Sequence, residues 1–244
     1  MLAGLVALRV GAGRLSLAVA DSAAAALAVA CPEAGVMGLA QSDRGSVLGQ
    51  DLDVLAGDLA TADVLLVGLG LDDPDHTKRM LRTLASLAPD HVPWVRDAFA
   101  LGVLSQLDDV VRRLSGRMVL TPNRAEAERL LDRPTGDDVD DLHTLVQRYG
   151  AVVAFRVWSP TAPEGRGRPG LAMSLATSGS GDVMAGALAG LMAWARRPNR
   201  RPAGRRTHTE LLAIGSPRDS GRSDTSLASC STSSRSSWSR SGPR

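Results

Sequence analysis

Short apolar runs alternate with helical segments along residues 1–195, and this alternation is the feature that most restricts the fold. Parallel strands joined by helical crossovers give such an order of elements. Pro93 makes the fourth run the weakest, because proline cannot donate a hydrogen bond to a neighbouring strand. The sequence therefore predicts an α/β layered fold. The expected strands are the apolar runs 15–20, 35–39, 64–67, 92–95, 118–120 and 152–157.

The helices expected between these strands have recognisable ends. Residues 22–30 are rich in alanine. Asp73 followed by Pro74 is typical of a helix cap and a first helical position. Residues 141–149 place apolar side chains on one helix face, and Gly150 ends that helix. These boundaries fit the proposed crossovers.

Ligands in open α/β sheets bind beyond the carboxyl ends of the strands, so the segments just after each strand are candidate sites. Gly68-Leu69-Gly70-Leu71 follows one expected strand, and residues 121–126 follow another. Two spaced glycines also suit a tight turn without a ligand. Asn123 and Glu126 have the spacing of a capping box, which needs no function. Both explanations stay open for each segment.

The third such segment is Gly179-Ser180-Gly181-Asp182, which opens the apolar helix expected at 183–195. Glycines let the backbone approach a ligand closely, and a helix N-terminus favours an anion. The run therefore predicts a phosphate site with the Asp182 carboxylate beside it. In the alternative interpretation, Ser180 is a simple cap and Asp182 a first-turn acid that complements the helix dipole. Gly186 and Gly190 are expected to allow close packing of this helix.

Charge divides the chain near residue 196. Residues 196–244 contain eleven arginines against three acidic residues, which leaves a net charge of −6 for residues 1–195. Twelve serines fall in the last 29 residues. This composition predicts a disordered tail at 196–244 after a single domain at 1–195. The arginines are not interleaved with aromatic residues, so a nucleic-acid partner is not expected.

Several protein classes are disfavoured. Two cysteines, Cys31 and Cys230, do not make a disulfide framework, and the histidines show no metal-ligand spacing. Asp21 interrupts the apolar run at 15–30, so this segment is interpreted as strand and helix rather than a signal sequence. No stretch reaches the ~18 apolar residues of a membrane span. A cytoplasmic protein is expected, and homo-oligomerisation stays open.

Read in order, these motifs resemble the ribokinase-like superfamily, and more closely its ADP- or ATP-dependent NAD(P)H-hydrate dehydratases. The resemblance implies a three-layer sandwich around a mostly parallel sheet, and it spans about residues 1–195. The segments that carry it are Gly11-Ala12-Gly13, Gly68-Leu69-Gly70-Leu71, Val95-Arg96-Asp97-Ala98, and residues 120–126 and 176–186.

The resemblance implies that ADP or ATP drives loss of water from hydrated NADH or NADPH. Asp182 would be the base, with Gly179, Ser180 and Gly181 as the phosphate cradle. Arg156 would contact the nucleotide, replacing a lysine-glycine pair. Gly70, Asn123 and Asp182 would contact the substrate. Glu126 would orient Mg²⁺ through water.

The chain departs from the family pattern at both ends. An N-terminal strand with a Gly/Ser-rich loop is expected to be missing, and the C-terminal helices of the family give way to the tail after residue 195. Two alternatives to the dehydratase follow. One is a ribokinase-like kinase acting on a sugar or a hydroxymethylpyrimidine. The other is an inactive remnant, truncated or frameshifted near Arg196.

Overall fold

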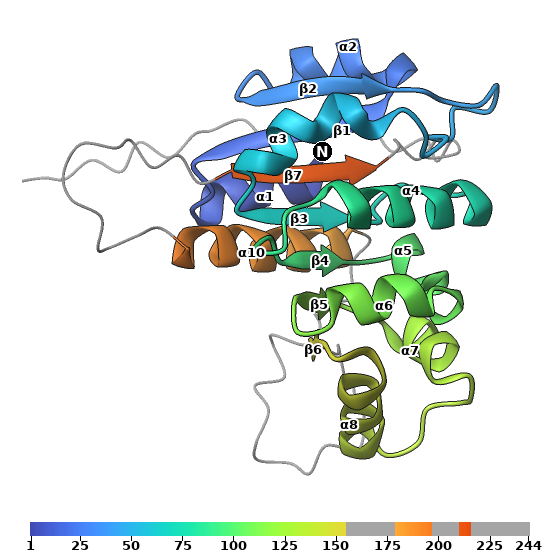
Figure 1. Ribbon diagram of the computed structural model, residues 1–244. Coiled ribbons are helices and arrows are strands. Elements are labelled where there is room, and N and C mark those ends of the chain that lie inside the picture. The colour runs from blue at the N-terminus through green and yellow to red at the C-terminus, as the bar shows by residue number, and fades with distance from the viewer. Residues whose placement is uncertain (155–178, 197–209, 216–244) are drawn as a thin grey trace, which may run out of the picture.

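The computed structural model describes residues 1–154, 179–196 and 210–215, which build a parallel sheet with helices on both faces (Figure 1). The strand order is β2-β1-β7-β3-β4-β5-β6, and every neighbouring pair is parallel. This arrangement confirms the predicted α/β fold. The strands are β1 (Arg14–Ala20), β2 (Ala34–Leu39), β3 (Val64–Val67), β4 (Trp94–Arg96), β5 (Met118–Leu120), β6 (Val152–Val153) and β7 (Glu210–Gly215).

The helices fall between the strands as the alternation predicts. Two short 3-10 turns, η1 (Leu52–Leu55) and η2 (Leu104–Gln106), interrupt the longer connections. The α-helices of the described ranges are α1 (Leu2–Val10), α2 (Asp21–Ala30), α3 (Ala56–Thr61), α4 (Pro74–Leu87), α5 (Phe99–Gly102), α6 (Asp108–Leu114), α7 (Arg124–Leu131), α8 (Asp138–Tyr149) and α10 (Ser180–Ala195).

The predicted helix ends are largely confirmed. The Asp73 side chain accepts hydrogen bonds from the backbone N–H groups of Asp75 and His76, at 2.9 and 2.8 Å, and Pro74 is the first residue of α4. Gly150 ends α8 in the left-handed region, at φ 54°. The fourth strand starts two residues later than expected, since Pro93 precedes it and β4 begins at Trp94.

Two hydrophobic cores lie on opposite faces of the sheet. Trp94 and Leu65 face helices α3 to α8, whereas Val95 and Leu66 face α1 and α10. Side chains on a strand alternate between faces, so neighbouring residues of β4 join different cores. The buried residues that α1 and α10 contribute to the second core are alanines, whose small side chains let both helices lie close to the sheet.

Strand β7 overturns part of the sequence interpretation. Residues 210–215 were expected in a disordered tail, yet they form a strand between β1 and β3. Leu212 and Ile214 are buried on one face and Ala213 on the other. The four apolar residues 211–214 are long enough for a parallel strand covered on both faces, but the average composition of 49 residues concealed them. Residues 210–215 therefore belong to the same sheet as β1 to β6.

The same strand joins the two parts of the sheet. The position between β1 and β3 is occupied by β7, so the sheet is continuous from β2 to β6. The chain on either side of β7, residues 197–209 and 216–244, lies outside the described residues. Among the helices that the structure describes, none is both long and apolar enough to cross a bilayer.

Candidate active site

Helix α10 presents its N-terminus at the carboxyl edge of the sheet. A side chain added at Gly179 would meet Leu2, at Gly190 would meet Ala7, and at Gly11 would meet Trp194, so α10 runs parallel to α1 along its length. Because α1 runs antiparallel to β1, both helices begin where the parallel strands end. The expectation that Gly186 and Gly190 allow close packing is confirmed, since each faces backbone of α1.

The turn that opens α10 begins at Gly179. Gly179 takes φ 83° and ψ −3°, a left-handed conformation that suits glycine. The N-cap residue is this glycine, so it makes no side-chain capping bond of the kind that Asp73 makes at α4. Asp182 lies half-buried in the first turn, and Ser180 is buried. The turn can therefore combine backbone donors with one carboxylate.

The glycines after β3 build a second turn at this edge. Gly68 takes φ 130° and Gly70 takes φ 78°, and the Leu71 N–H donates to the Gly68 carbonyl at 3.4 Å. A side chain at Gly68 would collide with the Asp97 carbonyl oxygen of the neighbouring strand and with Ala100. Gly68 thus serves close backbone packing, while Gly70 is half-buried at the edge itself.

The capping box predicted after β5 is present. The Glu126 N–H donates to the Asn123 side-chain oxygen at 3.0 Å, and the Asn123 N–H donates to a Glu126 carboxylate oxygen at 2.8 Å. The box fixes the start of α7. Both residues are half-buried, and they follow the carboxyl end of β5. Gly70, Asn123 and Asp182 consequently lie at the same edge of the sheet.

Sequence reasoning missed a buried polar link between β4 and β5. The Thr121 hydroxyl donates to an Asp97 carboxylate oxygen at 2.7 Å, and the Thr121 N–H donates to the Arg96 carbonyl at 3.2 Å. Thr121 is fully buried and Asp97 is 5% exposed. A signal was present, because Asp97 directly follows β4 and Thr121 directly follows β5. Only the pairing of β4 with β5 shows that they meet.

Arg96 is a second feature that the sequence did not reveal. Its guanidinium is fully buried, stacks over Trp94 at 5.0 Å, and has no hydrogen-bond acceptor within the described part of the chain. Burial lowers the pKa of Arg96 to about 9, so the side chain is charged at neutral pH. Arg96 belongs to the core beneath α4 to α7, away from α10.

The structure describes the predicted metal contact, Glu126, but not the predicted nucleotide contact, Arg156. Glu126 supplies one carboxylate, but no group of three His, Cys, Asp or Glu within residues 1–154, 179–196 and 210–215 could hold a metal ion. These residues do not form a protein cage for Mg²⁺. Arg156, the predicted nucleotide contact, lies outside the described residues.

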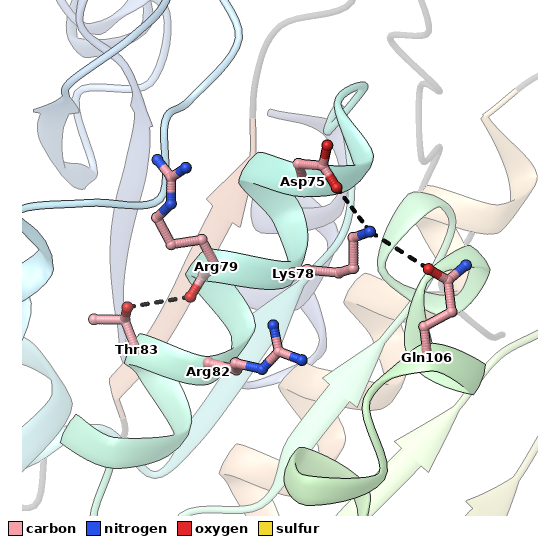
Figure 2. A pocket seen from close by; sticks show the side chains of 6 residues that line it. All are labelled: Asp75, Lys78, Arg79, Arg82, Thr83 and Gln106. Carbon is pink, nitrogen blue, oxygen red and sulfur yellow. Dashed lines mark hydrogen bonds and ion pairs between the residues drawn. The ribbon is translucent and has the colours of Figure 1, made fainter.

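A surface depression of about 490 Å³ lies along α4, on the face opposite α10 (Figure 2). Lys78 pairs there with Asp75 at 2.7 Å, and its ammonium group lowers the pKa of the Asp75 carboxyl. The Lys78 ammonium also donates to the Gln106 side-chain oxygen at 3.4 Å. Arg82 pairs with Asp109 at 3.0 Å. Asp75 and Asp109 thus neutralise much of the positive charge of the depression. None of the residues that line the depression belongs to the predicted site.

Comparison with known families gives the arrangement its context. The family model described as NAD(P)H-hydrate dehydratase matches residues 1–215, which includes β7. The chain belongs to the NAD(P)H-hydrate dehydratase family. This match agrees with the motif order at Gly68, Thr121 and Gly179, and it favours the dehydratase family over another ribokinase-like kinase.

Named relatives share this family. A bifunctional NAD(P)H-hydrate repair enzyme of Moorella thermoacetica is 32% identical over 213 residues, covering 81% of this chain and 38% of the relative. An ADP-dependent (S)-NAD(P)H-hydrate dehydratase of Xanthomonas campestris is 32% identical over 210 residues, covering 79% of this chain and 67% of the relative. This chain thus spans well under half of the bifunctional relative.

Solved structures support the fold. A ribokinase-like superfamily protein of Enterococcus faecalis superposes with a TM-score of 0.57 at 22% identity, covering 78% of this chain and 64% of that one. A protein of Streptococcus mutans gives a TM-score of 0.58 at 21% identity, covering 78% and 66%. At this identity the likeness concerns the fold alone, and it confirms the ribokinase-like architecture.

Proposed function

We propose that this chain removes water from hydrated NADH or NADPH at the expense of ADP or ATP. The observation that carries the proposal is the turn at Gly179, where the backbone N-terminus of α10 and the Asp182 carboxylate share one helix end. Membership of the NAD(P)H-hydrate dehydratase family and the printed names of its relatives support the same substrates. A cytoplasmic protein acting on small molecules, without nucleic acid or membrane, agrees with this activity.

The phosphate cradle would be built from backbone. The amides of Ser180 and Gly181 bind the terminal phosphoryl group of the nucleotide, and the positive end of the α10 dipole favours its negative charge. Charge on that group grows during transfer, so fixed backbone donors stabilise the transition state without reorganising. Gly179 in its left-handed conformation aims these amides at one point.

Asp182 would act as the base. Its carboxylate takes the proton from the substrate hydroxyl while that oxygen forms a bond to the terminal phosphorus and the phosphoanhydride bond breaks. Departure of the resulting phosphate breaks the ring C–O bond, and loss of a proton from the adjacent ring carbon to that phosphate or to water restores the double bond of the dihydronicotinamide ring. The overall change converts hydrated NAD(P)H and ADP into NAD(P)H, AMP and phosphate; with ATP the nucleotide product is ADP.

Gly70 and Asn123 would hold the substrate. The capping bond uses the side-chain oxygen of Asn123, so its side-chain NH₂ group is the part that would donate to the substrate. Gly70 lets the backbone after β3 approach the same ligand. Arg156 is proposed as a further nucleotide contact. The predicted Mg²⁺ would rely on nucleotide phosphates and water, with Glu126 acting only through water, and no step is assigned to it.

The proposal is tested by recovery of NADH absorbance from hydrated NADH with ADP present. Asp182→Ala should lower kcat by about 10²–10⁴-fold, the usual contribution of a general base. Asp108→Ala is a matched control, because Asp108 is also an acid in the first turn of a helix, α6, and is exposed. Equal activity of the two variants would contradict the role of Asp182.

Nucleotide binding is tested separately by thermal unfolding. ADP at ~100 times its Kd should stabilise the protein by about 2.7 kcal/mol. Gly181→Val should abolish this gain, because a branched side chain would crowd the cradle. Transfer of labelled phosphate from ATP to a sugar or a hydroxymethylpyrimidine, without recovery of NADH, would overturn the dehydratase in favour of a kinase.

A further inference from the structure

Asp97 joins the ends of three neighbouring strands. Its N–H donates to the Val67 carbonyl at the end of β3, at 3.3 Å. Its carboxylate accepts the Thr121 hydroxyl at the end of β5, at 2.7 Å. Its own carbonyl oxygen occupies the space where a Gly68 side chain would lie. Asp97 therefore contacts both turns that bracket the candidate substrate site.

The backbone beside Asp97 is strained. Ala98 takes φ 49° and ψ −124°, in a region that residues with a side chain rarely adopt. Such a conformation costs ~1–3 kcal/mol and persists only where the surroundings hold it. Here the hydrogen bonds of Asp97 and the contact with Gly68 surround the strained residue. The strain lies next to the link rather than in a surface loop.

Two residues predicted to bind substrate lie close in sequence to the two residues that Asp97 contacts, Gly68 and Thr121. Gly70 follows Gly68 by two residues, and Asn123 follows Thr121 by two. The Thr121 hydroxyl and the Asp97 carboxylate are buried, so water does not compete for the bond. A hydrogen bond to a buried charge is stronger than one between neutral groups.

We infer that Asp97 and Thr121 are positioning residues, whose hydrogen bond sets the separation of the Gly68–Leu71 and Thr121–Glu126 turns for the dinucleotide substrate. This inference rests on the proposed function. The nucleotide cradle opens α10, whose buried alanines belong to the core on the other face of the sheet from Trp94. The link therefore acts on the hydrated dinucleotide and leaves ADP binding unaltered.

Thr121→Val removes the hydroxyl and keeps the shape of the side chain, whereas Thr121→Ser restores the donor. Thr121→Val should raise KM for hydrated NADH on the order of tenfold, which corresponds to the loss of one charge-assisted hydrogen bond. KM for ADP should stay within about twofold, and Thr121→Ser should return both values toward the parent. Thr144→Val is the matched control, since Thr144 is an exposed threonine of α8.

A purely structural role for Thr121 predicts a different result. General loosening of the fold would raise both KM values together, and that outcome would overturn the inference. If the parent chain does not dehydrate the substrate at all, the proposed function fails by itself. Amide hydrogen exchange then tests whether the hydrogen bond between Thr121 and Asp97 couples the two turns.

Exchange should speed up in peptides covering both turns of the Thr121→Val variant, and in neither turn of Thr144→Val. Faster exchange restricted to the Thr121–Glu126 turn would show that the bond does not couple the two turns. That result would refute the inference whatever the activity of the chain. Asp97→Asn gives a second test, because an amide oxygen still accepts the hydroxyl but has no charge, so its effect should be smaller than that of Thr121→Val.

Discussion

The contiguous region 1–154 and the two short pieces at 179–196 and 210–215 differ in how they use the chain. The first builds six strands and the helices between them, and each of these strands pairs with one that is adjacent in sequence. The second contributes one helix and one strand, both packed against residues far away in sequence. Yet β7 occupies an inner position of the sheet, and α10 carries the candidate base.

This difference teaches that the two regions depend on each other. Without β7 the contiguous region would expose two apolar strand edges, on β1 and β3. Without α1 and the sheet beneath it, α10 would have no partner for its small-residue face. Truncation and substitution can test this dependence.

The largest effect is expected from the position at which the chain ends. A chain that stops at Ala195 lacks β7 and should lose its cooperative thermal transition, because the sheet is divided beside β1. A chain that stops at Gly215 keeps the strand and should melt cooperatively. Circular dichroism during heating distinguishes them, and equal midpoints would show that β7 adds nothing to the fold.

A substitution at the contact between α10 and α1 should have the next largest effect on stability. Gly186→Ala places a methyl group 2.7 Å from the Ala3 Cα and should destabilise the protein by ~3 kcal/mol, as overpacking does. Gly57→Ala in α3 meets no atom within 4 Å and should instead stabilise by ~0.5–1 kcal/mol, because alanine favours helix. Urea titration measures both changes. If the two substitutions shift stability in the same direction, α10 does not dock closely on α1.

The contiguous region contains a destabilising element of its own in Arg96. Arg96→Met removes a buried charge that has no hydrogen-bond acceptor among the described residues, and should stabilise on the order of 2 kcal/mol at neutral pH. Arg82→Met is the control, because Arg82 is half exposed and paired with Asp109. That substitution should change stability by less than ~1 kcal/mol.

The pH dependence of Arg96 has a defined sign. Burial lowers its pKa to about 9 in the folded chain, below its value in the unfolded chain. The unfolded chain therefore binds more protons above pH 9, and stability of the parent rises with pH relative to Arg96→Met. The difference between the two proteins should be constant below pH 9 and should narrow above it. A difference that widens above pH 9 would contradict the assignment.

The smallest effect is expected at the start of α7. Asn123→Ala removes the capping bond and should cost ~1 kcal/mol, whereas Asn123→Asp keeps an accepting oxygen and should cost only a few tenths. Thermal unfolding measures both. If Asn123→Ala lowered activity but left stability unchanged, Asn123 would serve the substrate and not the helix.

Much of the contiguous region could be predicted because its signals are local. The cap at Asp73, the capping box at Asn123 and the end of α8 at Gly150 each depend on residues a few positions apart. Apolar runs placed most strands within two residues of their observed starts. The shifted start of β4 also has a local cause, in Pro93.

The candidate site was predictable only in part. The Gly179 turn and the turn at Gly68 are visible as glycine-rich segments after strands, and the structure puts both at one edge. Thr121 and Asp97 lie 24 residues apart, and no sequence spacing relates them. Strand β7 was missed because four apolar residues within a polar, arginine-rich stretch resemble a chance cluster.

Local sequence was enough to predict the alternation of strands and helices, the helix caps and the glycine turns, because these follow from backbone preferences of nearby residues. Only the tertiary structure decided that β7 lies between β1 and β3, that α10 runs along α1, and that Asp97 meets Thr121. Each of these contacts brings distant residues together by burying apolar surface or a polar pair away from water. Burial of that kind depends on the whole fold rather than on any local pattern.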